Sequence, residues 1–161
     1  MTYLRAIIAF LALPGVVLGL IPALLVAADA NRGGGLPFGV VLMVPGVVFL
    51  LVCVRDFFIS GGGTLAPWDP PRRLVMVGLY RFVRNPMYVG DILWLLGWSL
   101  AVGSCWVAWY AALWAVLFHL RVIYHEEPWL RRQFGTDWEA YSASVHRWLP
   151  RLRPWNREKR I

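Results

Sequence analysis

Gly78-Leu79-Tyr80-Arg81-Phe82-Val83-Arg84-Asn85-Pro86-Met87-Tyr88-Val89-Gly90-Asp91 opens a long apolar segment, and Arg121-Val122-Ile123-Tyr124-His125-Glu126-Glu127-Pro128 closes it. The residues between these two polar stretches are almost all apolar. A segment of this length suits two antiparallel helices joined by a short turn, and such a hairpin brings its two ends together. We therefore predict that the polar stretches meet at one end of a helical hairpin and form the functional site there.

The rest of the chain is also strongly apolar. It has 161 residues, of which 59% are hydrophobic, and its mean hydropathy is +0.57. A helix needs roughly 20 apolar residues to cross a bilayer, and four runs approach that length, at 4–28, 37–54, 87–102 and 105–123. We predict an all-α integral membrane protein with about four transmembrane helices and short cytosolic interfacial helices at 75–83 and 128–144.

The predicted spans divide one membrane domain, residues 1–161, into two parts. Residues 1–54 form an N-terminal two-helix hairpin, and residues 55–161 form a core that ends in an amphipathic helix. Arg5, the loop 55–84 and everything after residue 123 fall on one side, whereas Arg32 falls on the other. Because Lys and Arg concentrate in cytoplasmic loops, both termini and the functional site are predicted to be cytosolic.

Composition argues against two kinds of site. The net charge of +7 is explained by membrane topology and anionic lipid headgroups, and no soluble domain remains that would bind nucleic acid. Cys53 and Cys105 lie inside apolar runs and are predicted to be small buried hydrophobic side chains. The sequence has no Cys-x-x-Cys, no His-Glu-x-x-His and no Cys/His cluster at metal spacing, so no metal is predicted.

Residues 84–88 stand where the first helix of the hairpin should begin. Pro86 suits the first position of a helix, and the free amides of that first turn suit an anionic group such as a carboxylate. The alternative is an ordinary interfacial anchor. Asp91 lies one turn further in, where an acid is costly, so it should face a polar cavity or pair with Arg81 or Arg84.

The second polar stretch should contain a break in the helix. Pro128 disfavours helical backbone at Glu127, so the chain is predicted to break near Glu126 and Glu127 and restart at Pro128. Arg121 and Glu126 are five residues apart and would meet only if that break turned Glu126 inward. Both acids could instead simply cap the next helix.

Further polar residues have simpler interpretations. His119 lies within the fourth predicted span and is expected to hydrogen-bond between helices rather than to act in catalysis. Arg147, Arg151 and Arg153 near the C-terminus are expected to contact lipid headgroups.

The spaced residues resemble a known family over about residues 55–150. They are Gly78-Leu79-Tyr80-Arg81, Arg84-Asn85-Pro86-Met87-Tyr88-Val89-Gly90, Arg121 with Glu126-Glu127, Leu130, Phe134-Gly135, Trp138, Tyr141 and Arg147-Trp148-Leu149-Pro150. The pattern resembles that of the isoprenylcysteine carboxyl methyltransferase and phospholipid methyltransferase family of integral membrane enzymes. In two places the chain departs from it, because Asn85 replaces a His and cannot titrate, and His146 replaces a Pro.

The resemblance implies an S-adenosylmethionine-dependent methyltransferase that needs no metal. Its acceptor would be lipophilic or lipid-linked (isoprenylcysteine carboxylate-like, a phospholipid amine or a small lipophile) and would enter from the bilayer to a site at the cytosolic face. In a prokaryote the membrane would be the bacterial inner membrane. The implied catalytic residues are Arg84, Arg121 and Glu126, and the implied cofactor-binding residues are Tyr80, Asn85, Pro86, Tyr88, Gly90, His125, Glu126 and Glu127.

Two other functions remain open. Gly90-Asp91 echoes the Arg-His-x-x-Tyr-x-Gly-Asp segment of membrane sterol reductases, which use NADPH. A non-enzymatic four-helix transporter could use the acids and His119 as a proton path. The sequence leaves the methyl acceptor and the oligomeric state open.

Overall fold

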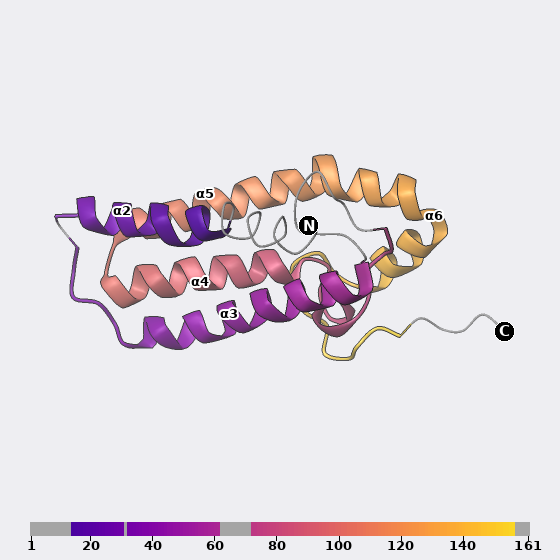
Figure 1. The fold of residues 1–161 in the computed structure, drawn as a ribbon, viewed down its shortest axis with the longest axis horizontal. Helices are drawn as coiled ribbons and strands as arrows, with labels where there is room; N and C mark the ends of the chain where they lie inside the picture. The colour runs from indigo at the N-terminus through magenta and orange to yellow at the C-terminus, as the bar shows by residue number, and fades with distance from the viewer. Residues whose placement is uncertain (1–13, 31, 62–71, 157–161) are drawn as a thin grey trace, which may run out of the picture.

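The computed structural model describes residues 14–30, 32–61 and 72–156, and within these ranges it contains helices and no β-strand. The all-α prediction is thus confirmed for the described residues. Figure 1 shows an elongated bundle in which α2, α3, α4 and α5 run side by side and α6 lies at one end. The elements are η1 (Gly15–Leu20), α2 (Ile21–Ala28), α3 (Phe38–Asp56), η2 (Phe57–Gly61), η3 (Gly78–Arg81), α4 (Pro86–Val102), α5 (Cys105–Arg121), η4 (Val122–Glu126) and α6 (Glu127–Ser144).

The predicted hairpin is formed by α4 and α5. Helix α4 begins at Pro86, which needs no hydrogen-bond acceptor at a helix start. It ends at Val102 and is followed by Gly103, whose φ of 69° lies in the left-handed region that glycine adopts without strain. The turn is fixed to the end of α2, because Ser104 Oγ donates a 2.6 Å hydrogen bond to Asp29 Oδ2. The two polar stretches therefore lie together at the opposite end of the hairpin.

Helices α3 and α4 approach each other closely through glycines. A Cβ atom built on Gly39 would lie 2.5 Å from the carbonyl oxygen of Gly97, and one built on Gly46 would lie 2.9 Å from that of Gly90. Gly39 and Gly46 are seven residues apart along α3, and Gly90 and Gly97 are seven residues apart along α4. The two glycines of each helix therefore lie on one face of it. Small residues allow helix backbones to approach closely. In a membrane, where the hydrophobic effect does not drive helices together, such close packing drives their association.

The predicted break near Glu126 and Glu127 is wrong. Backbone dihedral angles stay helical from α5 through η4 into α6, and η4 is a π-helical turn. A wider turn with i→i+5 bonding accommodates Pro128, which has no amide hydrogen to offer the usual i−4 acceptor. The change of direction comes instead at Gly135, with φ 47° and ψ −121°, and α6 folds back there (Figure 1). The helix ends at Ser144, as predicted.

Within the described residues, two helices are long and apolar enough to cross a membrane, Phe38–Gly61 and Cys105–Ser144. Gly15–Ala28 and Pro86–Val102 are apolar but shorter. The predicted span 4–28 begins outside the described residues, and the predicted interfacial helix at 75–83 is only the 3₁₀ turn η3. Cys53 is buried as predicted, whereas Cys105 is exposed.

The glycine contact predicts a stability difference between two glycine-to-alanine substitutions. Gly97→Ala should lower the free energy of unfolding by about 1–3 kcal/mol, because the added methyl group collides with α3. Gly19→Ala is the control, since a Cβ there meets no atom of the described residues within 4 Å and alanine favours helix. Thermal unfolding of both purified proteins in the same detergent measures the difference. Equal midpoints would contradict the close α3–α4 contact.

Candidate active site

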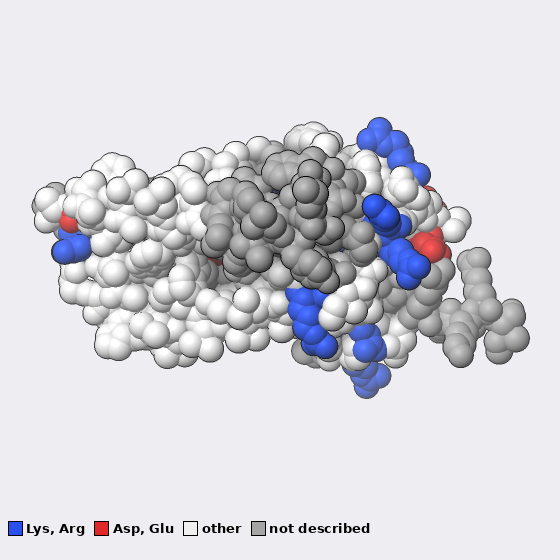
Figure 2. Space-filling view, viewed as in Figure 1, with Lys and Arg blue, Asp and Glu red and all other residues white. Residues whose placement is uncertain are grey.

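Charged side chains gather towards the end of the bundle that holds α6. On the face drawn in Figure 2, most of the visible Lys, Arg, Asp and Glu atoms lie at this end. Most of the rest of the described surface is white, which marks other residues. Two groups of polar contacts occupy this end, one around Glu127 and one around Glu126.

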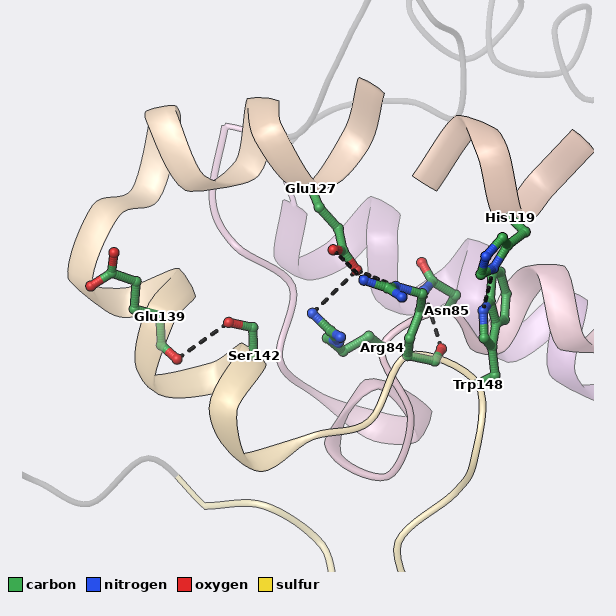
Figure 3. Close-up of polar contacts among 8 residues, drawn as sticks. Arg84, Asn85, His119, Glu127, Glu139, Ser142 and Trp148 are labelled. Carbon is green, nitrogen blue, oxygen red and sulfur yellow. Dashed lines mark hydrogen bonds and ion pairs between the residues drawn. The ribbon is translucent and has the colours of Figure 1, made fainter. Parts of the chain in front are cut away.

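Glu127 is held by two arginines from distant parts of the chain. Arg147 binds it bidentately, with Nε 2.7 Å from Oε1 and Nη2 2.8 Å from Oε2. Arg84 Nη1 lies 3.2 Å from the same Oε1, and Figure 3 shows Glu127 pointing from the helix towards it. The Arg84 guanidinium also lies 5.5 Å from the centroid of the Trp138 ring. We name Arg84, Glu127 and Arg147 the Glu127 triad.

Burial shapes the charges of this triad. Only 12% of the Arg84 side chain is exposed, and burial lowers its guanidinium pKa while the Glu127 carboxylate opposes that shift. The hydrogen bonds to Glu127 raise the pKa of Arg147. Two positive charges thus share one carboxylate in a half-buried place, which leaves a net positive charge next to the start of α4.

Glu126 forms the second group, which we name the Glu126 cluster. Its Oε1 accepts hydrogen bonds from Tyr88 Oη and, at 2.7 Å, from Arg121 Nε. The π-helical turn η4 explains the second bond, because residues five apart lie on one face where bonding is i→i+5. The Tyr88 ring stacks on Phe118, with centroids 4.3 Å apart and planes 17° apart. Tyr88 is therefore fixed from two sides.

The C-terminal segment holds the loop before α4 in place. Arg84, Arg151 and Trp155 each donate a backbone N–H bond of 2.9 Å, to the carbonyl oxygens of His146, Phe82 and Arg81. Asn85 Nδ2 donates to the Arg147 carbonyl at 3.1 Å, and Tyr141 Oη to the Tyr80 carbonyl at 2.7 Å. The loop is thus part of a hydrogen-bonded layer rather than a free connection.

Arg147 is the residue that the sequence interpretation missed. We expected it to contact headgroups, but the structure places it on Glu127. The available signal was the Arg147-Trp148-Leu149-Pro150 ending, which belongs to the family pattern. His119 also has an unexpected partner, since its Nδ1 accepts a 3.0 Å bond from Trp148 Nε1 in the C-terminal segment rather than from another helix.

The other predicted residues lie around the two groups. Pro86 is buried at the start of α4, and Tyr80 is buried against Cys53 and Val75. Gly90 faces α3, and His125 is exposed. The structure therefore brings Tyr88, Arg121 and Glu126 together, and Arg84 and Glu127 together with Asn85 beside them, but does not bring Tyr80, Gly90 or His125 into either group.

Asp91 does not pair with either arginine considered for it. Arg81 donates to the Trp155 carbonyl at 2.9 Å, and Arg84 binds Glu127. Asp91 is 9% exposed, and its Oδ1 has no hydrogen-bond partner among the described residues. It lines a cleft with α3 and η1, whereas Tyr88 faces α5, so these two residues of α4 have different neighbours.

The chemistry of the site suits a zwitterionic ligand. In the described part of the chain no side chain caps the start of α4, so its first amides offer hydrogen bonds to a carboxylate. The Glu126 side chain is 25% exposed and offers acceptor oxygens to an ammonium or a hydroxyl group. Over the described ranges no group of three His, Cys, Asp or Glu could hold a metal ion.

Fold and site together define an all-helical protein with apolar helices and a polar centre at the ends of one hairpin. Residues 36–137 match the sequence profile of the family described as phospholipid methyltransferase. The match spans well over half of the chain, and the protein belongs to this family. The matched range contains both polar stretches quoted above.

Curated relatives match over shorter regions. A probable protein-S-isoprenylcysteine O-methyltransferase of Oryza sativa subsp. japonica is 33% identical over 85 residues, 52% of this chain and 44% of the relative. Protein-S-isoprenylcysteine O-methyltransferase of Schizosaccharomyces pombe is 34% identical over 77 residues, 48% of this chain and 33% of the relative. Delta(14)-sterol reductase LBR of Gallus gallus is 32% identical over 83 residues, 49% of this chain and 13% of the relative.

The chain thus matches less than half the length of each of these relatives. No solved structure matches it significantly.

The triad predicts that Glu127 matters more for stability than an exposed acid of the same helix. Glu127→Gln leaves Arg84 and Arg147 without a counter-charge and should cost about 3 kcal/mol of unfolding free energy. Glu139→Gln is the matched control, because Glu139 is exposed on α6, and it should change stability by less than about 0.5 kcal/mol. Thermal unfolding in detergent measures both. Equal losses would show that the triad does not stabilise the fold.

Proposed function

We propose that the protein is an S-adenosylmethionine-dependent methyltransferase that acts on a lipophilic or lipid-linked acceptor at the cytosolic face of a membrane. Membership of the phospholipid methyltransferase family supports this, as do the names of the plant and yeast relatives. The observation that carries the proposal is the Glu126 cluster. It sets a half-buried carboxylate, an aromatic ring and an arginine beside the uncapped start of α4.

The donor set fits the proposed cofactor, which supplies a methyl group activated by a sulfonium. We assign its carboxylate to the amides that follow Asn85 and Pro86, because a helix start favours an anion. Glu126 would accept from its ammonium or ribose hydroxyls, and the ring of Tyr88 would face the sulfonium cation. Of the other residues assigned from the sequence, Tyr80, Gly90 and His125 lie outside both polar groups, so we do not propose them as cofactor contacts.

Glu127 acts in this proposal by positioning. Both of its oxygens already accept bonds from Arg147, and one also lies next to Arg84. The triad therefore fixes the loop before α4, and that loop fixes the helix start. Asn85 acts in the same way, because it donates to the Arg147 carbonyl and cannot carry a proton away.

Arg84 and Arg121 are the proposed catalytic arginines, together with Glu126. Arg121 uses Nε for Glu126, and 46% of its side chain is exposed. A guanidinium has four further N–H donors, which suit a carboxylate, phosphate or carbonyl group of the acceptor. Methyl transfer needs no metal and depends mainly on holding the two reacting atoms in line, so rigid positioning is the contribution expected from this chain.

We further propose four transmembrane helices with both termini and the site on the cytosolic side, in one domain of residues 1–161. Residues 1–54 supply an N-terminal hairpin and residues 55–161 the methyltransferase-like core. The position of both polar groups at one end of the α4–α5 hairpin supports this arrangement. In a prokaryote the membrane would be the inner membrane.

Cofactor binding is the direct test. Isothermal titration of the purified protein with S-adenosylhomocysteine should show saturable binding. Glu126→Gln should weaken it by about tenfold or more, since one bond to a charged group is lost. Glu139→Gln should leave the affinity unchanged, because Glu139 lies outside both groups.

The same titration with NADPH tests a second candidate. The match to Delta(14)-sterol reductase LBR favours a reductase, since Gly90-Asp91 also belongs to the reductase-like pattern. If the protein binds NADPH but not S-adenosylhomocysteine, the methyltransferase function is contradicted and the reductase function is favoured. Binding of neither ligand would contradict both enzymes and favour the transporter.

The topology can be tested with a native cysteine. Cys105 is exposed at the start of α5, at the end of the hairpin opposite the site, and Cys53 is fully buried. In intact cells a membrane-impermeant maleimide should label Cys105 from outside. A Glu139→Cys reporter in a Cys105→Ser background should react only after permeabilisation. The reverse pattern would contradict the cytosolic site.

A further inference from the structure

Two leucines in the segment after α6 are exposed to an unusual degree. Leu149 is 74% exposed and Leu152 is 100% exposed. Single exposed leucines are ordinary on a protein surface, but these two lie close together in a short segment that also contains Trp148. We name residues 148–154 the C-terminal strap.

Hydrogen bonds fix the strap to the rest of the fold, so its leucines are not exposed merely because the chain end is loose. Arg151 donates its backbone N–H, at 2.9 Å, to a carbonyl oxygen of the loop before α4. Trp148 Nε1 donates to His119 Nδ1 at 3.0 Å, as Figure 3 shows. Arg147, which directly precedes the strap, binds the Glu127 carboxylate. The strap therefore presents its leucines from a fixed position.

The bond to His119 places the strap level with the last turn of the apolar helix α5. His119 comes just before the end of that helix at Arg121, and its neighbours Leu117 and Leu120 are exposed. Under the membrane topology proposed above, on which this step rests, those leucines face lipid. Trp148 and the residues that follow it thus lie at the cytosolic boundary of the membrane rather than out in the cytosol.

The composition of the strap suits that boundary. An irregular segment is excluded from the hydrocarbon core, because its backbone groups would lack partners there. In the strap, Pro150 and Pro154 have no N–H to satisfy, and the N–H of Arg151 is already bonded. Trp is enriched where headgroups meet acyl chains. The strap can therefore lie at this depth without leaving many donors unpaired.

The charges of the strap favour the same position. Arg153 is exposed, whereas Arg151 is half-buried and has its Nη1 atom in the interior. The cytoplasmic leaflet has a negative surface potential, which attracts basic residues beside a membrane span. Of the two arginines in the strap, Arg153 is thus the one placed to meet a lipid phosphate.

We propose that the C-terminal strap is an interfacial membrane anchor. Leu149 and Leu152 insert where the headgroups meet the acyl chains, and Arg153 contacts lipid phosphate groups. The anchor takes the lipids of the bilayer in general and does not depend on which methyl acceptor the protein uses. Because Arg147 directly precedes the strap, the anchor also holds the Glu127 triad at a fixed depth.

Depth-dependent fluorescence quenching tests the anchor. Leu152→Cys in a Cys105→Ser background would carry a nitrobenzoxadiazole probe, with the full chain in nanodiscs of phosphatidylcholine and phosphatidylglycerol. Cys53 is fully buried and should not react. A lipid with a nitroxide near the top of its acyl chain should quench the probe strongly, whereas aqueous iodide should quench it weakly.

Two further probes in the same background serve as controls. Glu139→Cys, on the exposed side of α6, should be quenched by iodide and little by the lipid nitroxide. Val44→Cys, exposed near the middle of α3, should be quenched by a nitroxide near the end of an acyl chain. If iodide reaches the Val44 probe instead, the membrane topology itself is wrong. If only the Leu152 probe lies in water, the anchor alone is wrong.

A charged variant tests whether the leucines drive the insertion. With the probe at Leu149→Cys, the added change Leu152→Asp should shift the emission towards that of the Glu139 probe and restore quenching by iodide, because a carboxylate resists transfer into lipid. Leu152 is fully exposed, so the change does not disturb the packed interior. Leu152→Ile keeps an aliphatic side chain and should change neither property.

Three results would overturn the proposal. The first is iodide quenching of the Leu152 probe as strong as that of the Glu139 probe. The second is protection of the Leu152 probe from both quenchers, which would mean that protein covers the strap. The third is an unchanged Leu149 probe in Leu152→Asp.

Titration with S-adenosylhomocysteine keeps this result apart from the methyltransferase proposal. If the strap probe lies in lipid but the wild-type protein binds no adenosyl ligand, the anchor stands and the proposed function is wrong. If the ligand binds while the strap probe lies in water, the proposed function stands and the anchor is wrong.

Discussion

The bidentate ion pair between Glu127 and Arg147 is the contact on which the polar end of the molecule depends. It joins the first turn of α6 to the segment that follows this helix. That segment then bonds through its backbone to the loop before α4. A half-buried ion pair recovers its desolvation cost only when its geometry is good and its remaining donors are satisfied. Here Arg147 binds both oxygens of the Glu127 carboxylate, and this ion pair helps to fix the positions of Arg84 and Asn85.

A second constraint is the π-helical turn η4. In an α-helix residues five apart point in clearly different directions, so Arg121 and Glu126 would not meet. The wider turn brings them to 2.7 Å without breaking the helix. π-Turns of this kind are rare and frequently occur at functional sites. The apolar helix α5 therefore continues without a break into the polar first part of α6, up to the kink at Gly135, and the Glu126 cluster lies where the helix changes from apolar to polar.

Local signals in the sequence predicted a large part of this arrangement. Pro86 marks the start of α4, Gly103 marks its end, and the resulting hairpin brings the polar stretches together, all as expected. The sequence could not predict the π-turn, because Pro128 permits either a break or a widened turn, and tertiary contacts decide between them. The partner of Arg147 was missed for a related reason, since an arginine near the C-terminus looks the same whether it contacts lipid or a carboxylate 20 residues away.

Adjacent acids end up with different environments because successive residues of a helix point about 100° apart, as 3.6 residues complete one turn. Glu127 faces two arginines and is saturated by them, so it has little left to offer a ligand. Glu126 faces Tyr88 and one half-exposed arginine, and keeps acceptor capacity towards the open side. The first acid stabilises the framework, and the second is the one suited to touch a cofactor. Two neighbouring positions of one helix thus serve different purposes, because the first acid holds the loop before α4 through Arg84 and Arg147 and the second contacts Tyr88 and Arg121.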